Sequence, residues 1–252
     1  MTVLDRPVVL PKMAFLSAWG MVEVGDLPPA MGTNLHYWTT PEARRTLETR
    51  VLDTLTSLGL ARNGRLNTLW RNTLALLGCP DREYYAFTNF PGGESCSVLV
   101  ASGGGDALRA IISDDVIALE PLEDRWHATA LVDVLPDVPG AAVRPVTMAK
   151  GFYEDPHAGP RDIFADPVDT RDRDHLVEVM RRDRAAVHQL YTARREDRHR
   201  VRSSPITAID LAEDGGRVLT YATGDEQIVM EPGTPRGVVQ TLNNTMNGLD
   251  DD

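Results

Sequence analysis

The first eighty residues carry apolar side chains at helical spacing, interrupted by residues that start or end helices. Apolar positions recur every three or four residues within 15–22, 47–58 and 66–77. The Thr-Pro-Glu sequence at 40–42 has the form of an N-cap, a proline at the first helical position and an acid at the positive end of the helix dipole. The pattern predicts a short extended segment at 8–10 followed by three helices.

Beyond residue 83 the period changes to short extended runs rich in aromatic and β-branched residues. Clusters of turn-forming Gly, Pro, Ser and Asp separate four such runs, at 84–90, 96–101, 107–112 and 116–120. Parallel strands need crossover connections longer than these turns. The runs therefore predict an antiparallel meander.

The rest of the chain is predicted to contain both kinds of element and one long irregular segment. Residues 150–171 are rich in Pro, Gly and Asp, and we expect them to form a mobile loop. The other predicted elements are helices at 123–135, 172–195 and 235–246, extended runs at 204–212 and 217–230, and a disordered tail at 249–252.

An internal similarity links the two halves of the chain at an offset of 111 residues. The identical pairs are Leu108/Leu219, Asp114/Asp225, Ile117/Ile228, Glu120/Glu231, Pro121/Pro232, Arg125/Arg236 and Leu131/Leu242. Both copies read as strand, acidic turn, strand, Glu-Pro and helix. This repeat predicts two topologically related halves that share one sheet.

The predicted fold class is α+β, with a central antiparallel β-sheet flanked by helical subdomains and a quasi-two-fold internal repeat. A length of 252 residues is compatible with one domain of two intimately packed halves. We expect a single domain over 1–252, with an N-terminal half at 8–135 and a C-terminal half at 136–248.

Composition narrows the class of protein. A hydrophobic fraction of 42% is sufficient for a core and excludes wholesale disorder. A net charge of −11 argues against a surface that binds nucleic acid or anionic lipid throughout. The chain has no signal-peptide pattern and no run near the roughly 18 apolar residues of a membrane span. We therefore expect a cytoplasmic protein without a membrane partner.

The sequence contains no complete catalytic motif. Residues 93–97 begin like a nucleophile elbow but lack its final glycine, and the glycine-rich 102–106 lacks the Lys-Ser/Thr of a phosphate-binding loop. The six histidines form no metal-binding spacing. Cys79 and Cys96 are predicted to be small core residues and not a disulfide framework. We predict no enzyme activity, no cofactor, no metal site and no small-molecule substrate.

Positive charge is concentrated in residues 171–202, which hold ten arginines against six acids. Charges of alternating sign, such as Glu178 and Arg182 four residues apart, are typical of a solvated helix. Tyr191 is the single aromatic residue of this stretch, whereas surfaces that bind single-stranded nucleic acid interleave several stacking rings. A solvated or partner-facing helix is favoured. Binding of nucleic acid or another anionic partner by this arginine-rich helix stays open as the alternative.

Six short segments occur in a characteristic order between Val8 and Leu249. They are the helix at 10–28 with its Asp-Leu-Pro exit, TLTSLGL at 54–60 followed by Asn-Gly at 63–64, ALLGCP at 75–80, Val-Leu-Pro at 134–136 leading through Gly140 to Val143, RVLTYATG at 217–224 and VMEP at 229–232. In this order they resemble the EspG family of actinobacterial type VII (ESX) secretion-associated proteins.

The resemblance implies a non-catalytic cytosolic chaperone. Such a protein binds PE–PPE heterodimers at the exposed hydrophobic tip of the PPE partner, keeps them soluble and targets them for export. An exposed apolar end is an aggregation hazard that a partner surface can cover. By analogy, the partner surface is expected on the exposed sheet face and the C-terminal helices, with five candidates: Phe87, Asn89, Phe90, Val218 and Thr220.

Partner choice and oligomeric state stay open at this point. The turn at 91–94 is shorter than the corresponding loop of the mycobacterial members, where that loop tends to contact the partner. A self-pairing edge strand or helix would produce a homodimer.

Overall fold

A computed structural model describes residues 3–32, 40–123, 126–155, 169–196 and 199–251. Their strands are β1 (Val8–Pro11), β2 (Ala61–Arg62), β3 (Arg65–Leu66), β4 (Arg82–Asn89), β5 (Ser95–Gly103), β6 (Asp106–Ile112), β7 (Val116–Leu122), β8 (Val146–Ala149), β9 (Arg184–Glu196), β10 (His199–Arg202), β11 (Ile206–Leu211), β12 (Arg217–Ala222) and β13 (Gln227–Pro232). The helices are α1 (Lys12–Trp19), the 3-10 helix η1 (Pro29–Met31), α2 (Pro41–Ser57), α3 (Thr68–Gly78), α4 (His127–Val132), α5 (Lys150–Glu154), α6 (Arg171–Met180) and α7 (Pro235–Asp251).

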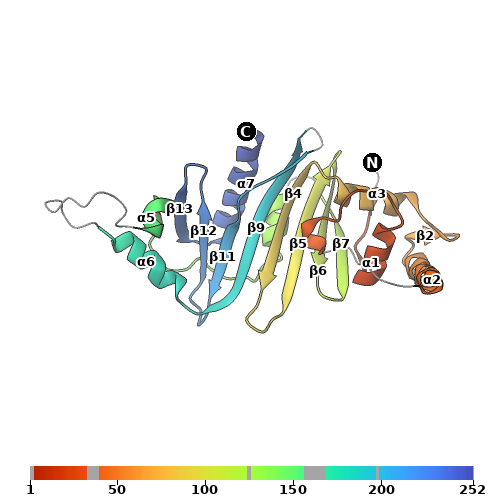
Figure 1. Cartoon of the computed structure of the whole chain (residues 1–252), viewed down its shortest axis with the longest axis horizontal. Helices are drawn as coiled ribbons and strands as arrows, with labels where there is room; N and C mark the ends of the chain where they lie inside the picture. The colour runs from red at the N-terminus through yellow and green to blue at the C-terminus, as the bar shows by residue number, and fades with distance from the viewer. Residues whose placement is uncertain (1–2, 33–39, 124–125, 156–168, 197–198, 252) are drawn as a thin grey trace.

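Eleven of these strands form one antiparallel sheet, which confirms the predicted fold class (Figure 1). The order across the sheet is β1-β7-β6-β5-β4-β9-β11-β12-β13-β8, and β10 pairs with the end of β9. The short strands β2 and β3 form a separate hairpin. The meander predicted between residues 84 and 120 is present as β4 to β7.

The strand order and the registers follow the internal repeat. The edge strand β1 pairs with β7 through Val8 opposite Leu119, and the other edge strand β8 pairs with β13 through Val146 opposite Met230. Residues 119 and 230 are related by the 111-residue offset. The backbone N–H of the lysine that follows each edge strand, Lys12 or Lys150, donates to the carbonyl of residue 115 or 226, at 2.7 and 2.8 Å. The halves therefore share topology and register, and they meet where β4 pairs with β9. In the aligned set, Arg125 lies outside the described residues.

The main error of the sequence-based prediction is the long helix at 172–195. The chain forms α6 only as far as Met180, and β9 begins at Arg184. Apolar residues at 187, 190 and 191 fit helical spacing, but buried positions 186, 188, 190 and 192 alternate as in a strand. Backbone pairing with β4 on one side and β11 on the other outweighs the helical propensity of the arginines and glutamates.

Smaller corrections concern element boundaries. The helix predicted at 123–135 is limited to α4, and the run predicted at 217–230 is two strands joined by a turn. Helix α7 continues to Asp251 and buries Leu249, so the expected tail at 249–252 is helical over its first three residues. In the expected loop at 150–171, residues 150–154 form α5, whereas 156–168 lie outside the described residues.

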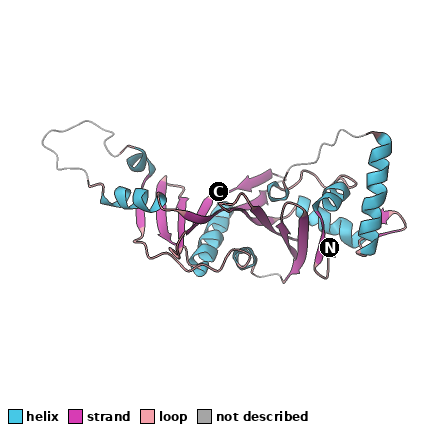
Figure 2. Ribbon diagram, turned by 90° about the horizontal axis from the view of Figure 1, so that it is seen from below, coloured by secondary structure: helices cyan, strands magenta, loops and turns pink. Residues whose placement is uncertain are grey.

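Side chains alternate between the two faces of the sheet, and different helices cover each face. Tyr85 on β4 points to one face, which carries α1 to α3 at one end and α5 and α6 at the other. Tyr84 points to the opposite face, which is covered centrally by α4 and α7. We call the first the wing face, because most of its described helices lie at the two ends and leave much of the middle of the sheet open (Figures 1 and 2). The 3-10 helix η1 reaches β5 and β4 on this face.

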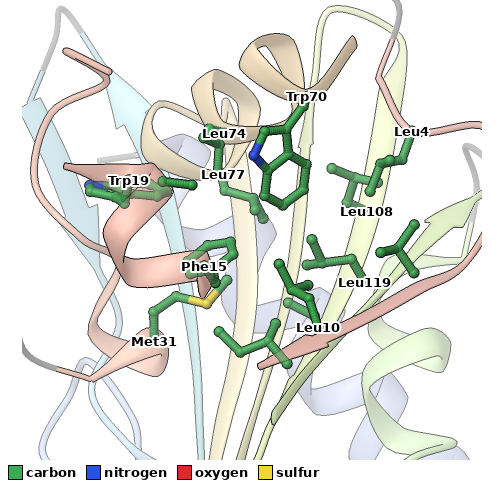
Figure 3. Packing of buried hydrophobic residues seen from close by; sticks show 14 of the residues in the cluster. Leu4, Leu10, Phe15, Trp19, Met31, Trp70, Leu74, Leu77, Leu108 and Leu119 are labelled. Atoms are coloured by element: carbon green, nitrogen blue, oxygen red, sulfur yellow. The ribbon is translucent and has the colours of Figure 1, made fainter. Parts of the chain in front are cut away.

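The largest core cluster lies beneath the N-terminal wing (Figure 3). Trp70 of α3 is fully buried and meets Phe15 of α1 edge to face, with ring centroids 6.1 Å apart. Leu108 and Leu119 contribute from the sheet. The helices α2 and α3 begin where side chains cap them: Thr40 Oγ1 accepts from Ala43 N, as predicted, and Asn67 Oδ1 accepts from Trp70 N at 2.7 Å. This packing fixes one border of the open strip.

A bare strip at the centre of the sheet as the candidate functional site

The open part of the wing face consists of two neighbouring rows of residues that cross the sheet. In one row Phe87 lies opposite Gln189, Gln189 opposite Thr207, and Thr207 opposite Thr220. The next row runs from Asn89 through Val187 and Ile209 to Val218. We call five exposed or partly exposed members of these rows the saddle: Phe87, Asn89, Gln189, Thr207 and Thr220. Val187 of the second row is also partly exposed.

Four of the five candidates from the sequence lie in these two rows on one face. Asn89 is exposed, and Phe87 and Thr220 are partly exposed. Val218 belongs to the same face but is fully buried in the core cluster beneath the C-terminal wing, so its side chain is not available at the surface. Phe90 follows β4 and is partly exposed beside the turn at 91–94.

The sequence reasoning missed Gln189 and Thr207, and it joined two surfaces that the sheet separates. Gln189 was missed because a helix was predicted over the residues that form β9. Its signal was the alternation of buried and exposed positions along 186–192. The C-terminal helix α7 packs on the opposite face, so the saddle and α7 do not form one continuous surface.

Three aromatic rings form a cluster at one end of the saddle. Tyr85 and Tyr191 lie opposite each other on β4 and β9 and stack, with centroids 5.0 Å apart and ring planes 13° apart. Phe87 meets both edge to face, at 5.8 and 6.2 Å. Ring faces and edges in these arrangements stabilise a pair beyond the burial of area. The cluster holds Phe87 in a fixed position at the edge of the saddle.

Two arginines of β10 lie over this cluster. The guanidinium carbon of Arg200 is 5.2 Å from the ring centroid of Tyr85, and that of Arg202 is 5.1 Å from the centroid of Tyr191. Arg200 also forms a fork with buried Glu83, with nitrogen–oxygen distances of 2.9 and 2.8 Å. Burial alone would lower the pKa of Arg200, but the hydrogen bonds and charge of Glu83 outweigh it and raise that pKa.

The opposite face contains a buried polar network that has the residue types of a catalytic triad. Thr88 Oγ1 lies 2.9 Å from His188 Nδ1, and His188 Nε2 lies 3.0 Å from Asp210 Oδ2. Arg217 donates to both carboxylate oxygens of Asp210, at 2.5 and 3.0 Å, and to the carbonyl oxygen of Pro136 at 2.9 Å. Desolvation would raise the pKa of Asp210, but hydrogen bonds from His188 and Arg217 more than offset it and hold that pKa below its ordinary value.

This network connects four central strands and is buried. Thr88, His188, Asp210 and Arg217 are each no more than 2% exposed. A nucleophile must reach a substrate carbonyl, and none of the four lines either described cavity of about 500 Å³. In this position the four side chains provide hydrogen-bond partners for one another inside the core.

The other sequence features have structural explanations. The glycines at 104 and 105 have φ of 60° and 85° and form the turn between β5 and β6, a conformation that favours glycine. Cys79 is exposed and Cys96 partly buried, so the prediction that both lie in the core is wrong. Over the described ranges, no group of three or more His, Cys, Asp or Glu is placed to hold a metal ion. Over the same residues, none of the helices has both the length and the apolarity needed to span a bilayer.

The sheet presents an open strip of mixed apolar and polar side chains between two groups of helices. This arrangement is typical of proteins that use a sheet surface to bind another macromolecule. The family model for EspG proteins matches residues 11–244, so the chain belongs to the EspG family. None of the curated proteins matches the chain.

A solved structure shares the fold. The chain is similar to the Mycobacterium tuberculosis type VII secretion system chaperone EspG5, solved in complex with the PE25–PPE41 dimer. The TM-score is 0.64 at 15% identity, covering 95% of this chain and 96% of that chain. At this identity the likeness establishes the fold.

Proposed function

We propose that the chain is a non-catalytic, cytosolic chaperone of a type VII secretion system that binds PE–PPE heterodimers. Membership of the EspG family supports this role, as does a fold shared with EspG5, whose structure is a complex with a PE–PPE dimer. The observation that carries the proposal is the saddle, an uncovered strip between two wings at the centre of a rigid sheet. The tip of a helical substrate would be covered there without any chemical step.

The saddle combines the properties that a helix tip requires. Phe87 offers an apolar ring, whereas Asn89 and Gln189 offer amide groups that can hydrogen-bond to the carbonyls at a helix end. Thr207 and Thr220 are short, so a partner backbone can approach the strands closely. We assign partner contact to these five residues and to Phe90, and leave Val218 in the core.

Co-expression with a PE–PPE pair encoded nearby tests the function. We expect one ternary complex by size exclusion, and failure to obtain a complex with any such pair would contradict the proposal. Asn89→Arg and Thr207→Arg place long cations into the saddle and are expected to abolish the complex while leaving the fold intact, as judged by circular dichroism.

A matched control separates the saddle from the rest of the sheet. Thr147→Arg introduces the same side chain at an exposed position of β8 on the α7 face and is expected to leave the complex unchanged. The same substitution at exposed Asn244 of α7 asks whether the partner uses the other face. Loss of the complex with Asn244→Arg, and not with the saddle variants, would place the contact on α7 and overturn the assignment.

A further inference from the structure

At the end of the saddle beside Tyr85 and Tyr191, the strip adjoins the arginines of β10. Its own residues are uncharged, but Tyr191 continues the strand from Gln189 on the same face and supports the guanidinium of Arg202. The hydroxyl of Tyr191 lies 3.4 Å from Gln189 Oε1, and its ring contacts Phe87. Arg202 is therefore continuous with the strip that we propose as the partner surface.

Among the described arginines of this end, Arg202 is one that remains available to a partner. Arg200 is neutralised by its fork with Glu83, and Arg195 donates to the carbonyl of Gly78 at 2.8 Å. Arg202 is exposed, and within the described part of the chain no carboxylate lies within ion-pair distance of it. A guanidinium fixed over a ring face is preorganised to accept a carboxylate, because less side-chain freedom is lost on binding.

The charge of the whole molecule limits what this cation can bind. The chain carries −11, so a long polyanion would be repelled by most of the surface. A short acidic group brought to Arg202 by a protein seated on the saddle avoids most of that repulsion. The local positive charge within an acidic molecule favours a protein segment with one or two carboxylates over a nucleic acid.

We propose that the saddle binds its partner in one orientation, with a carboxylate of the partner against Arg202 beside Tyr191. This inference rests on the proposed chaperone function and specifies the partner: an apolar tip flanked on one side by an acidic residue. Electrostatic complementarity of this kind fixes register and suppresses wrong partners more than it adds affinity.

The first test measures the dissociation constant of the ternary complex at 50 and 300 mM NaCl. Arg202→Gln is expected to weaken binding about fivefold and Arg202→Glu at least about tenfold at the lower salt, with a smaller salt dependence than the wild type. Arg65→Glu makes the same charge change at an exposed position of the β2–β3 hairpin and should stay within about twofold. Equal constants for the wild type and Arg202→Glu would overturn the inference while the chaperone function stands.

A second pair of variants tests the ring. Tyr191→Leu removes the ring face under Arg202 but leaves the charge, and we expect binding to weaken about threefold. Tyr191→Phe keeps the ring face and should weaken binding less than Tyr191→Leu does. If both variants bind equally, the ring does not position the arginine and that part of the inference is wrong.

A probe that does not depend on the secretion substrate separates the two proposals. A fluorescent peptide of eight residues, apolar except for two glutamates at one end, should bind the wild type at 20 mM NaCl in an anisotropy titration, and Arg202→Glu should abolish this binding. A peptide that does not bind overturns the inference even where a PE–PPE complex forms. If the wild type forms no PE–PPE complex but binds the peptide through Arg202, the chaperone function fails and acidic recognition stands. An RNA octamer that binds through Arg202 in place of the peptide would reassign the site to nucleic acid.

Discussion

At the scale of single residues, the carboxylate of Asp210 is a buried charge with two charged or polar partners. It lies 2% exposed between His188 on β9 and Arg217 on β12, so it balances a buried positive charge and joins neighbouring strands. A buried ion pair is a weak source of net stability, but removal of one member leaves the other charge uncompensated. The saddle on the opposite face depends on these same strands being held in register.

Asp210→Asn is expected to lower the free energy of unfolding by about 3–5 kcal/mol, because Arg217 would remain buried without its counter-charge. Urea denaturation followed by circular dichroism measures the change. Asp172→Asn removes the half-exposed partner of Arg144 and should cost no more than about 1 kcal/mol. A similar loss of unfolding free energy in the two variants would show that the buried ion pair is no more important for stability than the exposed one.

The stability difference between wild type and Asp210→Asn should depend on pH. The folded-state pKa of Asp210 lies below its ordinary value of 3.8, so the ionised carboxylate stabilises the fold at every pH above that value. This contribution is lost as the pH falls from about 4 through the lower, folded-state pKa. Unfolding measured between pH 3 and pH 7 should give a constant difference at the upper end and a shrinking one below about pH 4. A difference that grows on acidification contradicts the assigned direction.

At the scale of elements, the sequence predicted correctly those helices and turns whose ends are set by capping or turn-forming residues nearby. The capped start of α2 at Thr40 and the glycine turn of the β5–β6 hairpin are decided by residues within a few positions. Strand β9 is different, because its arginine-rich sequence is strand only through pairing with β4 and β11 on its two sides. Phe87, Asn89 and Thr220 were named from the sequence and lie in the saddle. Gln189 required strand β9 in place of the predicted helix, and Thr207, on a run predicted to be extended, required the pairing of β11 with β9 and β12.

The junction between α3 and the loop after α1 provides a prediction at this scale. A Cβ atom on Gly78 would lie 2.3 Å from the carbonyl oxygen of Val24 and 3.2 Å from the ring of Trp19. Helix propensity alone favours alanine over glycine in a helix, but this clash should reverse the sign. We expect Gly78→Ala to lower the free energy of unfolding by about 1–3 kcal/mol.

Gly92→Ala is the matched control for Gly78→Ala, because an added Cβ at Gly92 meets no atom within 4 Å. It should change stability by no more than about 0.5 kcal/mol in the same denaturation experiment. A Gly78→Ala protein at least as stable as the wild type would mean that the loop at 24–29 moves aside freely.

At the scale of the whole molecule, the internal repeat was readable because it preserves register along with residue types. The two edge ladders have the same register: Val8 lies opposite Leu119 in one, and Val146 lies opposite Met230 at the equivalent position in the other. The proposed site of partner contact was predicted only in part, because the saddle is formed where the halves meet and neither half contains it alone. Rows that combine Phe87 with Gln189 and Thr220 require both halves.

The meeting of the halves leads to a prediction about folding. Strand β4 pairs with β9 through eight residue pairs, and one core cluster combines Val98 and Val100 of the first half with Val238 and Leu242 of the second. Fragments 1–135 and 136–252 would each expose a central strand and half of that cluster, which is an aggregation hazard. We expect neither fragment to unfold cooperatively on its own, whereas the two refolded together should recover the circular dichroism of the intact chain and its complex with a PE–PPE pair. A fragment 1–135 that unfolds cooperatively as a monomer would show that the first half is an independent domain and that the sheet is assembled by docking of preformed halves.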